Sequence, residues 1–380
     1  DARGRIFSGH TGGDTRGFHY VQGGYSQKGF GKHGPLSNPY TFGYFPAMKH
    51  NKVPRFTHTF TIYEADALPE IYRGRLFGVA PLLNHVVMSK VFPDGSSFRT
   101  EDVGYAIESS DPWFRPVDIT LGLDGNLYIA DWYDKQVNHY RNHEGQIDPG
   151  NGRIYRLRAK DLSNVPHKAA PPPRDFGSLP SMELVQLLSH PNRSVRQLAL
   201  RIIGDRKDVS IIPTLRLILE RPAGQTSLES LWALHQVGGL DEPTSLKALA
   251  HPDPYVRLWT VRLLGDGNQV SPTILDRLVN LARKDSNVEV RSQLACTARR
   301  LPAADSLAIV RPLLAKSEDV GDIHIPLLLW WAVEAKLTTD PDRVLELFRD
   351  PAFWELPIVK STVEERTMRR LAASGTRKDL

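Results

Sequence analysis

Acidic and aromatic residues gather after a tight turn in residues 114–140, which read FRPVDITLGLDGNLYIADWYDKQVNHY. Alternating apolar residues run up to Asp124-Gly125, a pair typical of short hairpin turns, and the next strand ends on Asp131-Trp132-Tyr133-Asp134. Arg115 stands at the start of the first strand. The hairpin therefore predicts that an arginine, acids and aromatic rings meet at one strand end. The alternative is that Asp131 and Asp134 only cap this strand end and pair with Arg115 or Arg141.

Histidine is the other residue type with possible chemistry, because imidazole binds metals and carries protons near neutral pH. No histidine pair has a spacing that is diagnostic of a metal site; His139 and His143 are four apart, but Asn142 and Gly145 argue against a helix that would align them. Phosphate loops, Ser-His-Asp sets and dinucleotide fingerprints are absent from the sequence in convincing form. Eight of the 13 histidines fall at or before residue 143: His10, His19, His33, His50, His58, His85, His139 and His143.

Composition excludes several classes of site and partner. Cys296 is the single cysteine of the 380 residues, which rules out an internal disulfide framework, a Cys-rich zinc site and haem attachment through Cys-x-x-Cys-His within this sequence. The net charge of +5 is well mixed along the chain, so nucleic-acid binding has little support. The longest apolar stretch, 323–333, is too short to span a membrane. The sequence starts Asp-Ala-Arg-Gly, without Met or a signal-like region, and we interpret it as a piece of a longer protein.

Short strand-like segments bounded by Gly, Pro, Asp and Asn fill the first half. A weak repeat relates residues 4–10, 74–80 and 125–131, each with a turn Gly, an apolar–aromatic pair and then small residues. Such a repeat, with loop insertions, predicts about three blades of a β-propeller. The Asp94-Gly95 and Asp124-Gly125 pairs predict hairpin turns. The predicted strands are 56–63, 75–79, 85–91, 117–122, 126–130 and 153–157.

A helical repeat follows a proline-rich linker, PHKAAPPPRDFGSLP. HPNRSVRQLA at 190–199 recurs as HPDPYVRLWT at 251–260 and, more loosely, as KDSNVEVRSQ at 284–293. A degenerate copy at 230–233, SLWA, divides the longer gap. Helix pairs that repeat at this spacing make an α-solenoid, and the pattern resembles HEAT repeats. The helical half is therefore expected to be an interaction or spacing element.

One arginine recurs in these copies, at Arg196, Arg257 and Arg291. The three arginines either form a ligand-binding ladder or pair with an Asp of the neighbouring repeat, and the second interpretation is favoured. The apolar residues of the same copies are expected to pack between helices; these are Val195, Ala199, Val256, Val261 and Leu263.

The strand region resembles the soluble quinoprotein sugar dehydrogenases, the glucose/sorbosone dehydrogenase-like propellers. The matching motifs are RPVDI…GLDGNLYIADWYD, TIYEADALPEIYRGRLFGVAPLLNHVVMSKVFPDGSSF and the loop GHTGGD at 9–14. The whole chain resembles the planctomycete-type membrane-bound dehydrogenases, which join such a propeller to HEAT repeats and a cytochrome c domain; GHTGGDTRGFHYVQGGY, KGFGKHGPLSNP and DWYDKQVNHYRNHEG carry that likeness. This resemblance implies a multidomain β + α fold, the C-terminal part of a six-bladed propeller (1–162), a linker (163–180) and a HEAT-type α-solenoid (181–380).

The resemblance also implies a cofactor site for pyrroloquinoline quinone and Ca²⁺. Arg115 aligns with the first Arg of the family's Arg-x-Arg-Asp-Val strand, where a guanidinium suits a quinone carboxylate. His10 and Asp14 belong to the loop that lies beside quinone and metal, Gly12 and Asp14 are the implied metal ligands, and Asp131 and Tyr133 complete the implied cofactor site. The second Arg of the family's motif aligns with Val117, and the family's loop proline is missing. The hydride-abstracting base would lie on an earlier blade, outside this sequence.

Two functions follow from these patterns. The first is a piece of a periplasmic or otherwise exported bacterial redox protein that oxidises a sugar or alcohol and passes electrons to a haem c module beyond this sequence. The second is a non-catalytic propeller and HEAT protein that binds a polysaccharide or a protein partner. The missing Arg and Pro favour the second function, whereas the polar, His-rich loops and the redox module of the similar proteins favour the first.

Overall fold

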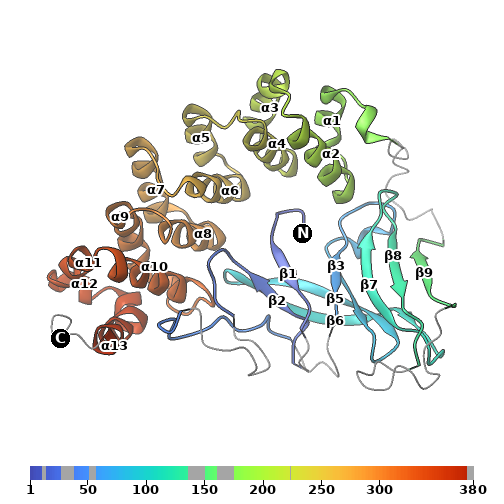
Figure 1. Cartoon of the computed structure of the whole chain (residues 1–380), viewed down its shortest axis with the longest axis horizontal. Coiled ribbons are helices and arrows are strands. Elements are labelled where there is room, and N and C mark those ends of the chain that lie inside the picture. The colour runs from blue at the N-terminus through green and yellow to red at the C-terminus, as the bar shows by residue number, and fades with distance from the viewer. Residues whose placement is uncertain are drawn as a thin grey trace.

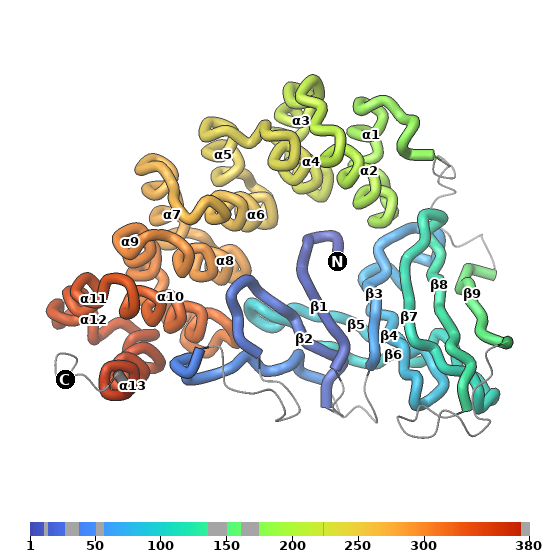
Figure 2. Tube along the Cα trace, in the orientation of Figure 1, coloured from blue at the N-terminus to red at the C-terminus, as the bar shows by residue number. Residues whose placement is uncertain are grey.

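Strands form the first part of the chain and helices the second, in a computed structural model that describes residues 1–10, 14–26, 38–50, 57–135, 150–160, 175–222 and 224–374. The helices follow one another in an arc that curves over the strands (Figure 1). The chain trace shows residues 1–8 running inside this arc (Figure 2). None of the helices in the described ranges has the length and hydropathy that a bilayer span requires.

Three antiparallel sheets make up the strand region. Their strands are β1 (Ile6–Ser8) with β2 (Phe18–Tyr20); β3 (Phe60–Ile62), β4 (Leu76–Ala80), β5 (His85–Asp94) and β6 (Ser97–Glu108); and β7 (Pro116–Leu121), β8 (Leu127–Asp131) and β9 (Arg153–Leu157). The two predicted hairpin turns are present, with Gly95 and Gly125 at φ 60° and 77°. One sheet has four strands, as a propeller blade has; the number of blades and the closure of a ring stay predictions.

The larger sheets share one core, in which Tyr63 is completely buried. The Tyr63 hydroxyl accepts from Leu68 N at 2.7 Å and donates to Gly125 O at 3.0 Å, so it fixes the β7–β8 turn against β3. The predicted strands agree with β3 to β5 and β7 to β9 apart from their ends. Three strands, β1, β2 and β6, were not among the predicted strands, although β1 lies in the first copy of the predicted repeat, 4–10. β6 carries polar residues without a clear apolar alternation and is held mainly by pairing with β5.

Pairs of antiparallel helices fill the second part. Their bounds are α1 (Ser181–Leu187), α2 (Arg193–Arg206), α3 (Ile212–Leu219), α4 (Gln225–Gln236), α5 (Glu242–Leu249), α6 (Pro254–Leu264), α7 (Pro272–Lys284), α8 (Val288–Ala298), α9 (Ala303–Leu314), α10 (Ile325–Thr339), α11 (Pro341–Phe348), α12 (Pro351–Trp354) and α13 (Glu364–Ser374). In each predicted copy the Asn or Asp caps the following helix: Asn192, Asp253 and Asn287 accept from the main-chain N–H two residues later. Of the predicted packing residues, Val195, Ala199, Val256 and Val261 are buried and Leu263 is partly buried.

The recurring arginines link successive repeats. Each also donates through Nη1 to the carbonyl six residues earlier, in the turn before its helix. The prediction that each arginine pairs with an acid of the neighbouring repeat is therefore confirmed, although the first acid is a Glu and not an Asp. We call these three ion pairs the arginine ladder. The pairs are Arg196–Glu229 at 2.8 Å, Arg257–Asp285 at 2.8 and 3.0 Å, and Arg291–Asp319 at 2.6 Å through two nitrogens.

The strand region packs along the side of the helical array that faces it, formed by α2, α4, α6, α8 and α10, which we call the inner face (Figure 1). At one end, Asn192 Nδ2 donates to Gly122 O at 2.8 Å, on the β7–β8 turn. In the middle, Arg5 of the segment before β1 pairs with Glu289 of α8. At the other end, Phe45 is buried within the helical core, so the two parts share apolar as well as polar contacts.

Candidate functional site

The structure brings three of the implied site residues together at the start of β7 and the end of β8. The main-chain N–H of Arg115 and that of Tyr133 both donate to Asp131 Oδ1, at 2.8 and 2.9 Å. The ring of Tyr133 stacks on Trp113, and the guanidinium of Arg153 lies 4.3 Å from its centroid. Asp131 therefore acts as the cap that the alternative interpretation predicted, and it fixes the turn after β8.

The guanidinium of Arg115 is turned into the protein. It is 8% exposed, and its Nη1 and Nη2 donate to the carbonyls of Phe114 and Lys135. Burial lowers the pKa of this group, against the carboxylates of Asp134, Asp131 and Asp111. Nε of Arg115 and Oδ2 of Asp131 are buried without a hydrogen-bond partner among the described residues. One of the two N–H groups of each terminal nitrogen thus binds a main-chain oxygen, and the guanidinium is buried, whereas a bidentate carboxylate clamp needs its N–H groups turned towards the ligand.

The other implied residues come from the β1–β2 pair. His10 follows β1, where its main-chain N–H donates to Thr57 O at 3.2 Å and its ring lies 5.0 Å from Phe18. Asp14 is exposed, and Gly12 lies outside the described residues. Among the described residues, no three His, Cys, Asp or Glu side chains are placed to hold a metal ion. The implied metal ligand Gly12 lies outside the described residues, so the quinone and Ca²⁺ site that the resemblance implies stays a prediction.

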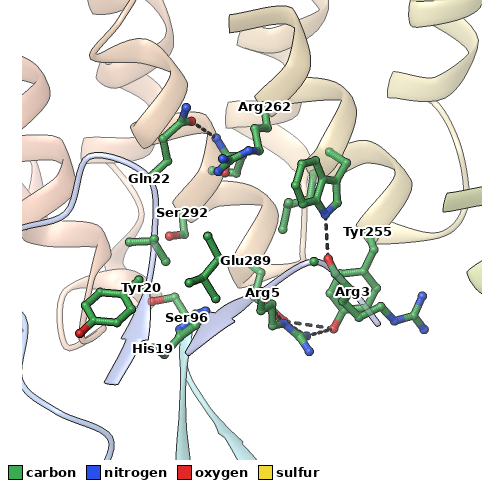
Figure 3. Close-up of a pocket in the computed structure, with 16 residues that line it drawn as sticks. Arg3, Arg5, His19, Tyr20, Gln22, Ser96, Tyr255, Arg262, Glu289 and Ser292 are labelled. Carbon is green, nitrogen blue, oxygen red and sulfur yellow. Dashed lines mark hydrogen bonds and ion pairs between the residues drawn. The ribbon is translucent and has the colours of Figure 1, made fainter. Parts of the chain in front are cut away.

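A cavity of about 130 Å³ lies where the β1–β2 pair meets α6 and α8. Figure 3 shows Arg262 and Ser292 on the helix side of this cavity and His19 and Tyr20 on the strand side. Two buried atoms in its wall, His19 Nδ1 and Ser292 Oγ, have no hydrogen-bond partner among the described residues. The cavity has room for several water molecules or one small polar group.

Arg5 closes one end of this cavity through a buried ion pair (Figure 3). Its Nε and Nη2 each donate to one carboxylate oxygen of Glu289, both at 2.7 Å, and Nη2 also lies 2.6 Å from the Tyr255 hydroxyl. Burial opposes the charge of Arg5, but the bonds to Glu289 and Tyr255 outweigh it and raise the pKa of the guanidinium. These residues hold the strand region on the helices, a task that needs no reactive group.

The inner face and its flanking helix ends repeat one kind of contact, which the sequence interpretation missed. Side-chain N–H groups donate to main-chain carbonyls in turns and loops of the strand region, among them the Asp1–Gly4 turn and Gly23. Trp232 and Trp259 occupy matching positions of the repeat, since Leu231-Trp232 and Leu258-Trp259 are 27 residues apart. This recurring Leu-Trp pair is the sequence pattern from which the contact position could have been predicted. The contacts are Gln225–Ala2 O at 2.6 Å, Trp259–Arg3 O at 2.7 Å, Arg299–Gly23 O at 2.7 Å, Trp330–Thr41 O at 3.0 Å, Trp331–Thr41 O at 2.9 Å and Arg366–Phe42 O at 3.1 Å.

Two family models match parts of the chain. Residues 242–321 match HEAT repeats, which confirms the HEAT resemblance for the segment that contains α5 to α9 and suggests protein interaction. Residues 28–161 match a domain of unknown function, DUF7133, and this match assigns no activity to the chain. A search of the curated proteins gave no match to the chain. The dehydrogenase assignment therefore stays a prediction.

Proposed function

We propose that this chain is a protein-binding scaffold whose inner face holds polypeptide segments through their main-chain carbonyls. The observation that supports this most directly is the set of side-chain N–H groups that bind main-chain carbonyls, from Gln225 on α4 to Trp331 on α10. Every polypeptide segment outside regular secondary structure offers such carbonyls, so a face of this kind binds loops and turns largely through their backbone. This is the protein-partner form of the second function that the sequence predicted.

The indole groups suit this task because indole N–H is a donor only. Trp330 and Trp331 both donate to Thr41 O while their rings remain in the helical core, where each is 0% exposed. A rigid, buried donor loses little side-chain entropy when it binds a carbonyl. The inner face is therefore pre-organised, as is expected of a surface that binds main-chain carbonyls.

The competing proposal is the exported quinoprotein, with a propeller ring that binds a sugar or alcohol and a separate haem c module. Its support is the likeness of the strand motifs, together with the unpartnered Arg115 Nε and Asp131 Oδ2. Against it stands the use of both terminal nitrogens of Arg115 by main-chain oxygens. The described Arg115 faces main-chain oxygens and not a cavity large enough to be identified as a quinone site, so the quinone site remains the weaker proposal.

Site-specific photo-crosslinking in the organism that produces the protein tests the scaffold function. A photoreactive residue at the exposed Gln236 of α4 should give an adduct with one protein, identified by mass spectrometry. The same residue at Asp276, exposed on the outer helix α7, should give none. Equal adducts at both positions would contradict the proposal. So would dye reduction with a panel of sugars after addition of pyrroloquinoline quinone and Ca²⁺ to the complete protein, which would favour the redox function.

A further inference from the structure

The cavity of about 130 Å³ between the β1–β2 pair and helices α6 and α8 carries an excess of positive charge. Its described wall contains three arginines and one carboxylate (Figure 3). Arg5 pairs with Glu289, and Arg3 Nη1 lies 3.6 Å from Asp253 Oδ2. Arg262 of α6 has neither a hydrogen bond nor an ion pair with any residue of the described ranges. The wall therefore holds one cation that no acid balances.

The guanidinium of Arg262 is held in place and is still accessible. Its Cζ lies 5.0 Å from the centroid of the Trp259 ring, a cation–π contact that positions the group. Trp259 is itself fixed, because its indole donates to Arg3 O. Arg262 is partly exposed, and none of its nitrogens is among the buried polar atoms that lack a partner. Its N–H groups can therefore reach a ligand in the cavity.

Gln22, after β2, adds a neutral donor from the strand side. Its Oε1 accepts from Gln293 Nε2 at 3.0 Å, which orients the amide and leaves Gln22 Nε2 free to donate. Gln293 Nε2 also donates to Thr297 Oγ1, which donates to the carbonyl of Val261, the residue before Arg262. These bonds bring Gln22 to the end of the cavity where Arg262 lies (Figure 3). Gln22 is partly exposed as well, and its Nε2 is not among the buried atoms without a partner.

We propose that this cavity binds a small oxyanion, phosphate or a short carboxylate, through the guanidinium of Arg262 and the amide N–H of Gln22. A guanidinium presents two parallel N–H groups to such an anion, and the amide adds a third donor. The volume is well below that of pockets for larger ligands, which favours a small anion over a peptide or an oligosaccharide. The bound oxyanion connects α6 with the segment after β2 and so fastens the strand region to the helices. This site goes beyond the scaffold function and does not depend on it.

Isothermal titration calorimetry of the full chain with sodium phosphate and, separately, sodium acetate tests this site, with chloride keeping the ionic strength constant. At least one of these anions should bind one-to-one, and the tighter of the two identifies the ligand class. Arg262→Met should weaken that binding about tenfold or more, since charge-assisted hydrogen bonds are lost. Arg262→Lys keeps the charge and should weaken it less. Gln22→Glu keeps the acceptor for Gln293 but replaces the N–H donor by a carboxylate that repels anions, so binding should be lost.

Arg201→Met is the matched control, because it removes the same charge from an exposed position on α2 and should leave the anion affinity unchanged. Hydrogen exchange gives a second measurement: the anion should slow exchange in peptides from β2 and α6 of the wild-type chain, but not of Gln22→Glu. Absence of binding by both anions, or equal affinity of Arg262→Met and the wild type, would overturn the site. Gln236 is not in the wall of this cavity, so if its adduct forms in that case, the scaffold function stands and only this site fails.

Discussion

At the scale of single residues, two buried histidines make the contact between strands and helices sensitive to acid. The rings of His19 and His324 lie 5.5 Å apart and are 5% and 1% exposed. Burial lowers the pKa of both: to about 4 for His324, opposed by Asp322, and well below the usual value for His19, where His324 and Arg5 add to the effect. In the unfolded chain both pKa values return to about 6.5. The unfolded state therefore binds more protons below that pH, and stability is lost as the pH falls from about 6.5 towards 4.

We expect the free energy of unfolding, measured in urea, to fall by about 2 kcal/mol between pH 7 and pH 5 from His324 alone. His324→Phe should remove most of that part of the pH dependence, because the ring no longer titrates. His235→Phe is the control, since His235 is exposed on α4 and its removal should leave the slope unchanged. An unaltered pH dependence in His324→Phe would contradict this account.

At the scale of elements, the arginine ladder should set the stability of the helical array. Asp285 is 6% exposed, and both of its oxygens accept from Arg257. Arg257→Met leaves this carboxylate buried without its cation, which costs about 3 kcal/mol or more. We expect a lower urea midpoint for the helical circular-dichroism signal. Arg201→Met provides the comparison, because Arg201 and Asp205 form an exposed pair at 3.9 Å and the change should stay within about 0.5 kcal/mol.

The double variant Arg257→Met with Asp285→Leu separates the cost of an unpaired buried carboxylate from the effect of losing the arginine charge. It should recover part of the stability that Arg257→Met loses, because no unpaired carboxylate remains. No recovery, or an equal effect of Arg201→Met, would show that the ladder does not carry the stability of the array.

Local signals made most elements predictable from the sequence. The Asp-Gly turns needed positive φ at Gly95 and Gly125, and the capping residues Asn192 and Asp253 stood next to periodic apolar residues. The same hairpin logic placed Arg115 beside Asp131. What the sequence did not reveal was the use of these groups: whether Arg115 binds a ligand or a main-chain carbonyl depends on where Lys135 folds back.

The inner face was missed for a related reason. The partners of Trp259 and Gln225 are 256 and 223 residues away along the chain, and no local pattern encodes such a contact. The recurrence of Leu-Trp in successive copies marked the position but not its partner.

At the scale of the whole molecule, the strand region and the helices are joined at both ends and in the middle of the array. Asn192 binds the β7–β8 turn, Arg5 binds Glu289, and Trp331 binds Thr41 O. Contacts spread over the array in this way couple the two parts. Weakening one contact should therefore raise the rate of local unfolding in both the strand region and the helices. The scaffold function depends on this coupling, because a separated strand region would leave the inner face without the segments that it now holds.

Arg5→Met tests the coupling at its middle contact. The substitution keeps much of the length of the side chain but removes the cation that pairs with Glu289. The Glu289 side chain, which is 14% exposed, then keeps only its hydrogen bond from the Tyr255 hydroxyl among these residues. We expect the free energy of unfolding to fall by about 3 kcal/mol. Hydrogen exchange followed by mass spectrometry should then show faster exchange in peptides from β1–β2 and also from α6 and α8. Arg73→Met is the matched control, since Arg73 and Glu70 form an exposed pair and exchange should not change. Faster exchange confined to the strand peptides would mean that the helices are stable without the strand region, and that the two parts are neighbours and not one cooperative unit.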